Sequence, residues 1–188
     1  DSVHPLSEAV EVDYFLPGCP PPATSVAEAV GAIARGALPP KGSVLAGQKN
    51  LCQSCPRKKE EKRVKEFRRV HEFVPDPESC FLEQGMICAG PATRDGCGYR
   101  CIEANMPCRG CFGPAPDVSD QGTRLASAVA TLVDSNDEAE IRRVVGRLAD
   151  PVGTLYRFGV SSSILGGRRI PPGEANGGQR ASGAKEMS

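Results

Sequence analysis

The positions of the cysteines constrain this 188-residue chain more than any other feature of its sequence. Eight of the nine cysteines lie between residues 52 and 111, and two pairs, Cys52–Cys55 and Cys108–Cys111, have the C-x2-C spacing. This spacing lets two thiolates reach one metal centre from a single tight turn. Because eight thiols make two sets of four, they predict that metal ligation organises the middle of the chain.

The rest of the composition indicates a thin apolar core. The chain has 21 Gly and 17 Pro but only 6 Phe, 3 Tyr and no Trp, so aromatic area is scarce and chain-breaking residues are frequent. Its 23 basic and 23 acidic residues cancel, which argues against binding nucleic acid or an acidic membrane surface by bulk charge. No apolar stretch approaches the ~18 residues that a membrane-spanning helix needs. We therefore expect a soluble protein with neither kind of partner.

The sequence predicts a mostly irregular fold with several α-helices, organised by its metal sites and divided into four parts. The four parts are 1–40, with a short strand, a Pro-rich turn around Cys19 and a helix; 41–116, which carries the other cysteines; 117–165, with C-terminal helices; and 166–188, a flexible tail with almost no apolar residues.

Helical patterns appear before and after the cysteine-rich part. Ser25 and Glu28 have capping-box spacing and predict the start of the first helix. Segments 123–133 and 138–148 also have helical periodicity, and Ser135 predicts a capping box for the second of them.

A charged stretch at 57–70, RKKEEKRVKEFRRV, interrupts the cysteine-rich part. Its composition predicts a short exposed helix, whose basic face is either simply solvated or a docking surface for an acidic redox partner. His71 follows directly and is either an ordinary surface histidine, a proton carrier or a hydrogen-bond donor to one of the metal sites.

Three kinds of site can explain so many thiols: disulfides of a secreted domain, two structural zinc sites, or two iron-sulfur clusters. The odd number of cysteines and the two C-x2-C pairs argue against a pure disulfide framework. Residues 88 to 111 give C-x8-C-x3-C-x6-C-x2-C among Gly and Pro, whereas zinc ligands usually sit on recognisable hairpins. A Gly-rich wrap lets backbone N–H groups approach the sulfurs of a cluster, so the pattern favours iron-sulfur clusters.

The order of four motifs resembles one known family. VDYFLPGCPPP, CQSC, CFLEQGMICAGPATRDGC and MPCRGCFGP, within residues 5–165, are together similar to the cluster-bearing C-terminal part of the small, electron-transferring subunit of nickel-iron hydrogenases. Within that family they look most like the cytoplasmic, cofactor-coupled group that includes methyl-viologen-reducing enzymes. The family's small subunit also has an amino-terminal flavodoxin-like α/β domain. We expect that half to be absent or largely absent here, because the sequence is a piece of a longer chain or because a separate chain supplies it.

The resemblance implies a ligand role for each cysteine. It makes Cys19 one ligand of the proximal [4Fe-4S] cluster, the one nearest the nickel-iron centre. It assigns the distal [4Fe-4S] cluster to Cys52, Cys55, Cys80 and Cys88, and three medial ligands to Cys97, Cys108 and Cys111. Relatives with a medial [3Fe-4S] cluster lack a fourth thiolate, and Cys101, four residues after Cys97, is placed to supply it. We therefore expect a medial [4Fe-4S] cluster.

The resemblance also implies the function. Hydrogen would be cleaved in a separate large subunit, so this chain would contribute no catalytic residue and would relay electrons to or from a downstream redox subunit. That subunit would be of the heterodisulfide-reductase-linked, flavin or nicotinamide, or ferredoxin type, and the complex would be cytoplasmic. Two alternatives remain. One is the homologous iron-sulfur subunit of an NADH or quinone oxidoreductase, which shares GCPPP but retains only the proximal site. The other is a zinc-stabilised interaction module.

Overall fold

The computed structural model describes residues 4–61 and 63–166, and in these residues short helices alternate with long irregular loops. The α-helices are α1 (Leu6–Ala9), α2 (Ala23–Ala34), α3 (Leu51–Ser54), α4 (Arg100–Glu103), α5 (Gln121–Ala130), α6 (Glu138–Gly146) and α7 (Pro151–Leu155). Three 3-10 helices complete them: η1 (Gly90–Ala92), η2 (Val160–Ser162) and η3 (Ile164–Gly166). Of the tail expected at 166–188, only Gly166 lies within the described residues.

The one named sheet in the described part of the chain has two short parallel strands. β1 (Tyr14–Phe15) pairs with β2 (Ser43–Val44), with Tyr14 opposite Ser43. The short strand expected near the start of the chain is therefore present. None of the helices in residues 4–61 and 63–166 has the length and apolar character needed to cross a bilayer.

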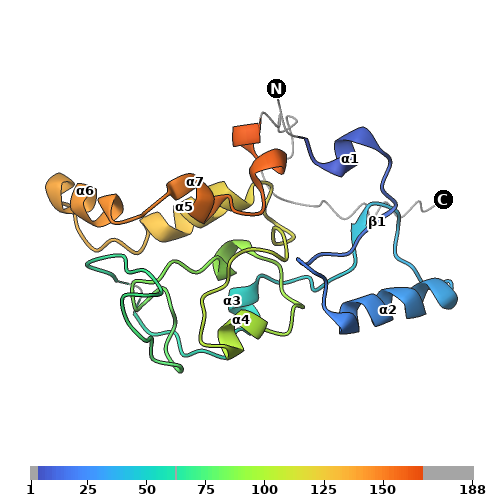
Figure 1. Cartoon of the computed structure of the whole chain (residues 1–188), viewed down its shortest axis with the longest axis horizontal. Coiled ribbons are helices and arrows are strands. Elements are labelled where there is room, and N and C mark those ends of the chain that lie inside the picture. Colours follow the sequence, from blue (N-terminus) through green and yellow to red (C-terminus); the bar gives the residue numbers. More distant parts are fainter. Residues whose placement is uncertain (1–3, 62, 167–188) are drawn as a thin grey trace, which may run out of the picture.

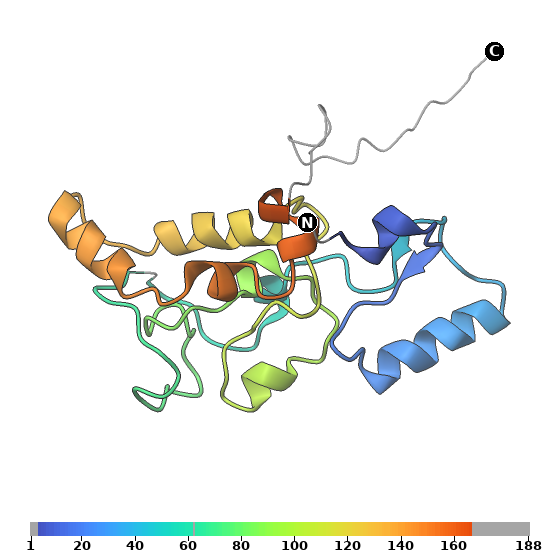
Figure 2. The same cartoon turned by 45° about the horizontal axis from the view of Figure 1, so that its top comes forward.

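The helices form two groups around the cysteine-bearing loops. Figures 1 and 2 show α5, α6 and α7 as a layer along one side of these loops, whereas α2 and the strand pair lie at the other end of the molecule. Helix α5 packs against η1 and α7, and α3 also packs against η1. The segment η1 therefore joins the helical layer to the loops that carry the thiols.

The core lies between this layer and the loops, and sulfur makes up part of it. Its buried apolar members include Leu51, Phe67, Phe81, Met86, Ile102, Leu125 and Val144. Cys80, Cys88 and Cys108 are buried in the same cluster. Most of the core residues before Leu125 come from irregular segments, so burial there depends on what holds the loops together.

The charged stretch at 57–70 is not a helix, and the prediction of one was wrong. In the described residues 57–61 and 63–70 the segment is irregular, and backbone hydrogen bonds join it to distant segments: Val64 N–H donates to Leu132 O at 2.9 Å, and Arg68 N–H donates to Gly85 O at 2.9 Å. Val64 and Phe67 are buried. Pairing with neighbouring segments buries these two side chains while most of the charged ones stay outside, and that outweighs the local preference for a helix.

Two helix starts also differ from the predicted caps. Helix α2 begins at Ala23 after Pro22, with no side-chain cap, and Ser25 is buried in its first turn. In α6 the cap is Asp137, whose carboxylate accepts from Glu140 N–H at 2.8 Å. In both cases the sequence located the helix, but the observed cap lies three residues before the predicted one in α2 and two residues after it in α6.

A buried arginine ties together the loops around the first C-x2-C pair. The Arg57 guanidinium donates to Asp76 O and Ser79 O, both at 2.7 Å, and to Asn105 Oδ1 at 2.6 Å. It also stacks over the Phe81 ring, 3.6 Å from the ring centroid. Arg57 is 6% exposed, so these contacts are made away from water. They fix the loop after Cys55 against the loop before Cys80.

We predict that Arg57→Ala lowers the free energy of unfolding by about 3 kcal/mol, because two carbonyls and an amide oxygen lose a charged, buried donor. The measurement is anaerobic urea unfolding. The matched control is Lys58→Ala, which removes an exposed ion pair with Glu78 and should cost much less. Equal costs for the two variants would contradict this role for Arg57.

Candidate metal centres

All nine cysteines are free thiols in the structure, and most of them form two adjoining groups. The first group contains Cys52, Cys80 and Cys88. The second contains Cys97, Cys101, Cys108 and Cys111, with Cys19 beside it. No three His, Cys, Asp or Glu side chains in the described part of the chain are placed to hold a single metal ion.

The first group meets at Gly90. A Cβ added to Gly90 would lie 2.9 Å from Cys52 Sγ and 3.6 Å from Cys88 Sγ, so any larger residue there would force the Cys52 sulfur to move. Cys52 is held in α3 by a capping box in which Asn50 and Gln53 bond each other's backbone N–H groups. Cys80 is buried near Cys88: burial first, and then the thiolate charges of Cys52 and Cys80, raise the pKa of Cys88. The structure thus packs Gly90 closely against two of these thiols.

Cys55 belongs to the same predicted set but is placed differently. It is the C-terminal cap of α3 and packs, half-buried, against the core. It is not among the groups that affect the pKa of Cys88. The structure therefore brings together three of the four predicted distal ligands, with Cys55 one helical turn from Cys52.

The second group surrounds a cavity of about 190 Å³. A single water needs only ~15 Å³ of such space, so the cavity has room for a much larger object. Its lining includes five cysteines: Cys19, Cys97, Cys101, Cys108 and Cys111. All four predicted medial ligands therefore face one cavity. Cys19, predicted to belong to a different cluster, lines the same cavity.

The loop after Cys108 is held by a side chain that sequence reasoning missed. Gln121, the first residue of α5, donates through Nε2 to Gly110 O at 3.0 Å and to Thr93 Oγ1 at 3.1 Å. Gly110 has φ +92°, and a Cβ there would lie 3.2 Å from Gln121 Nε2. Asp120 caps α5 and thereby fixes Gln121. The sequence shows this cap before a helix, but not that the next side chain would turn toward the cysteines.

Burial strongly favours the neutral thiol at two positions. It raises the pKa of Cys88 from 9.0 to about 12, although backbone N–H groups of Gly90 and Cys108 bond its sulfur and lower the pKa. Burial likewise raises the pKa of Cys108 to about 12, although hydrogen bonds from the Gly110 N–H and the Thr93 hydroxyl lower this pKa. A bound cation would reverse this preference, because metal ligation requires thiolates.

A backbone hydrogen bond links Cys19 to the second group. Burial, and then the charge of Cys101, raise the pKa of Cys111, whereas the Cys19 N–H donates to the Cys111 sulfur and lowers it. Cys19 itself is exposed. Its main chain therefore belongs to the wall of the second site, while its thiol remains accessible.

The two groups touch at Cys88 and Cys108. The Cys108 N–H donates to the Cys88 sulfur, and the charge of Cys88 in turn raises the pKa of Cys108 after burial has done so. Ala89 N–H donates to Cys108 O at 2.9 Å. A metal cluster bound by the first group of thiols would therefore lie close to a cluster bound by the second group.

These residues fit iron-sulfur clusters. Backbone N–H groups point at the sulfurs of Cys88, Cys108 and Cys111, the kind of bond that stabilises a cluster's thiolates and sets its potential. The 190 Å³ cavity provides space beside the second group.

Other charged residues near the thiols have structural partners. Arg94 is buried and donates to Gly47 O at 3.0 Å. Asp95 accepts from Lys49 N–H and from Ser54 Oγ, which joins the α3 loop to the second group.

Comparison with known proteins identifies relatives in hydrogenases. No protein-family model matches the chain. The F420-non-reducing hydrogenase iron-sulfur subunit of Archaeoglobus profundus is 38% identical over 170 residues, which cover 88% of this chain and 52% of that protein. An F420-non-reducing hydrogenase subunit of Methanothermus fervidus is 37% identical over 93 residues, 48% of this chain and 73% of that protein. The sulfhydrogenase 2 subunit delta of Pyrococcus furiosus is 28% identical over 113 residues, 60% of this chain and 38% of that protein. The chain spans about half the length of the first of these relatives.

We predict that alkylation of the metal-free chain follows burial. At about pH 8, iodoacetamide should modify exposed Cys19 first and Cys88 and Cys108 at least about tenfold more slowly, because the thiolate is the reactive form. The two slow rates should rise with pH toward about 12. The folded state holds these protons more tightly than the unfolded one, so the metal-free chain should lose stability as pH rises above about 9. Mass spectrometry of each peptide gives the rates, and equal rates at all three cysteines would contradict the placement.

We predict that Gly90→Ala prevents metal binding by the first group, because its Cβ would lie 2.9 Å from Cys52 Sγ and would displace that sulfur. Metal analysis of the anaerobically purified protein should show a loss of about half the bound metal. The control is Gly146→Ala, at an open helical position, which should leave the metal content unchanged. Full metal content in Gly90→Ala would show that the first group of thiols next to Gly90 is not a metal site.

Proposed function

Because the chain belongs to the family of F420-non-reducing hydrogenase iron-sulfur subunits, we propose that it is the cluster-bearing part of an electron-transferring small subunit of a nickel-iron hydrogenase. The proposal is carried by one observation: two groups of thiols, with sulfurs bonded by backbone N–H groups, touch at Cys88 and Cys108, and the second group lines a cavity. The chain would take electrons from hydrogen oxidation in a large subunit and pass them to a partner redox subunit, or work in reverse.

We assign one [4Fe-4S] cluster to each group. Cys52, Cys55, Cys80 and Cys88 would hold the distal cluster, and Cys97, Cys101, Cys108 and Cys111 the medial one. Cys101 supports a complete medial cluster, because it lines the cavity together with the other three thiols. When bound, each cluster supplies a reversible one-electron carrier.

The chain's own residues would keep these carriers in fixed positions and tune them. Arg57 holds the loops around the first group, and Gln121 holds the Cys108–Cys111 loop through Gly110 O. N–H groups of Gly90, Gly110 and Cys19 stabilise negative charge on the sulfurs of Cys88, Cys108 and Cys111, and burial opposes it. Contact between Cys88 and Cys108 keeps the distance for electron transfer between the two groups short.

Cys19 is proposed as a ligand of a third, proximal cluster, whose remaining ligands would come from outside these nine cysteines. Its exposed thiol is available for such a role. Its N–H bonds the Cys111 sulfur, so one residue would contact the medial site through its main chain and the proximal site through its side chain.

The partners are also part of the proposal. Helix α2 exposes Val26, Val30 and Ile33, and the last two are each 60% exposed. An apolar helix face of this kind is typical of a surface covered by another polypeptide, which supports a hetero-oligomeric complex with a large subunit. We propose the cytoplasm as its location.

Anaerobic purification followed by metal and sulfide analysis tests the proposal. We expect about eight irons and eight labile sulfides per chain, two cubane clusters' worth. About two zinc ions and no sulfide would instead identify a zinc-stabilised module and end the proposal.

A second test concerns the medial ligands. Cys101→Ala should leave the distal cluster intact and convert the medial one to a [3Fe-4S] species with an EPR signal in the oxidised state. Cys19→Ala is the matched control, since Cys19 lines the same cavity without being assigned to this cluster. Identical spectra for the two variants would show that Cys101 is not a ligand.

A further inference from the structure

A pocket of about 300 Å³ on the helical side of the molecule concentrates positive charge. It lies between the segment at 67–71, the loop around Cys108 and the connection from α6 to α7. Its basic lining consists of Arg68, Arg69, Arg109, Arg147, Arg157 and His71. Asp150 is the acidic side chain that faces it from the described residues. The whole chain is neutral, so this excess is local.

Much of this charge is not compensated within the described part of the chain. Arg147 pairs with Glu72 at 3.4 Å and Arg68 pairs with Glu66 at 2.8 Å. Arg109 and Arg157, by contrast, have no ion-pair partner among residues 4–61 and 63–166. Arg69 forms no ion pair there either, although the nearby Glu72 carboxylate accepts from its backbone N–H and the Arg69 charge helps to lower the pKa of Glu72. The carboxylate of Asp150 already accepts from Gly153 N–H at 3.0 Å as the cap of α7.

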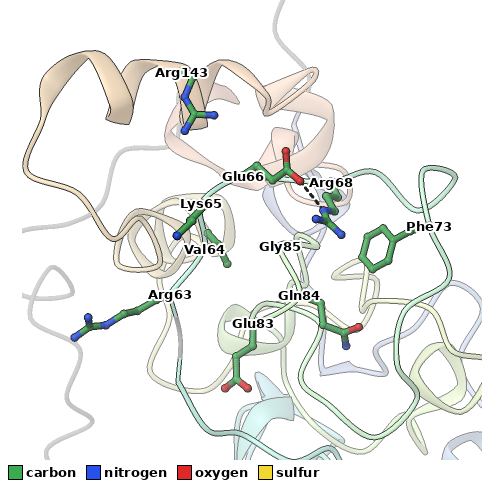
Figure 3. Close-up of a pocket in the computed structure, with 10 residues that line it drawn as sticks. All are labelled: Arg63, Val64, Lys65, Glu66, Arg68, Phe73, Glu83, Gln84, Gly85 and Arg143. Atoms are coloured by element: carbon green, nitrogen blue, oxygen red, sulfur yellow. Dashed lines mark hydrogen bonds and ion pairs between the residues drawn. The ribbon is translucent and has the colours of Figure 1, made fainter.

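In a neighbouring pocket the arginines are paired with acidic side chains. Figure 3 shows this larger pocket, of about 560 Å³, with Glu66, Glu83 and several basic side chains around it and the Glu66–Arg68 pair marked. Arg63 and Arg143 in its lining pair with acidic residues as well. The smaller pocket is therefore distinguished by its unpaired arginines.

The arginine pocket also reaches the covalent surroundings of both groups of thiols. Ile87, in its lining, precedes Cys88, and Pro107 and Arg109 flank Cys108. Those two cysteines are where the groups touch. A partner seated in the pocket would contact residues that are adjacent in the sequence to each of the two buried cysteines.

We propose that this arginine pocket docks the acidic surface of an electron-accepting protein, and that electrons leave the chain there. The proposal rests on the electron-transfer function proposed above. Unpaired arginines attract carboxylates over long range and bind them in bidentate pairs. The guanidinium groups come from three separate chain segments around an open pocket. The lining of this pocket also contains the apolar side chains of Phe67 and Met86. Spread charge with an apolar centre suits a protein surface better than a single small anion.

The test uses a purified acidic [2Fe-2S] ferredoxin as the probe, with basic cytochrome c as its opposite. Binding to the anaerobically purified chain is measured by surface plasmon resonance at low and high salt. The double variant Arg69→Glu/Arg157→Glu should weaken ferredoxin binding at low salt by about tenfold or more, and high salt should remove the difference. Cytochrome c binding should strengthen in the same variant.

The matched control is the double reversal Arg63→Glu/Arg143→Glu in the compensated pocket of Figure 3, with the same change in net charge. It should alter ferredoxin binding by less than about twofold. An equal loss of ferredoxin binding in both double variants would show that net charge alone causes the effect, and it would overturn the proposal. Inorganic phosphate that binds in the pocket when ferredoxin does not would also overturn it, in favour of a small-anion site.

Iron and sulfide are measured on every preparation, together with circular dichroism to check folding. A chain that contains no clusters would contradict the proposed electron-transfer function. A cluster-loaded chain whose ferredoxin binding does not depend on these arginines would contradict only the proposed docking site.

Discussion

The structure depends on the burial of thiols that must carry negative charge to bind metal. Cys80, Cys88 and Cys108 lie in the same core as Phe81 and Met86. Without a cation, burial holds the pKa of Cys88 and of Cys108 at about 12 and keeps both thiols neutral. Iron ligation would supply the missing positive charge and would contribute to the folding free energy. This accounts for a core with little aromatic area and for loops that lack regular hydrogen bonding.

The surrounding polar contacts follow from the same constraint. Irregular loops cannot hold thiols in place by backbone ladders, so side chains hold them. Arg57 joins the loops on either side of the first group, and Gln121 joins α5 to the Cys108–Cys111 loop. Contact between Cys88 and Cys108 would then keep the two proposed carriers close enough for electron transfer, and residues next to both cysteines in the sequence line the arginine pocket. The proposed path of electrons is thus part of the same set of contacts.

Much of the candidate site could be predicted from the sequence, because cysteine spacing is a local property. The four cysteines predicted as medial ligands line one cavity, and three of the four predicted distal ligands lie together. Features that depend on tertiary contacts could not be predicted. The stretch at 57–70 resembles a helix in composition, but its backbone pairs with segments far away in the sequence. The roles of Gln121 and of Cys19 N–H, and the arginine pocket, arise only where separate segments meet.

The most direct test of the account is anomalous scattering at the iron edge from crystals of the anaerobically purified chain. The account predicts two separate iron peaks, one beside Cys52, Cys55, Cys80 and Cys88 and the other beside Cys97, Cys101, Cys108 and Cys111. Signal at the zinc edge alone, or density for disulfides between these cysteines, would contradict it.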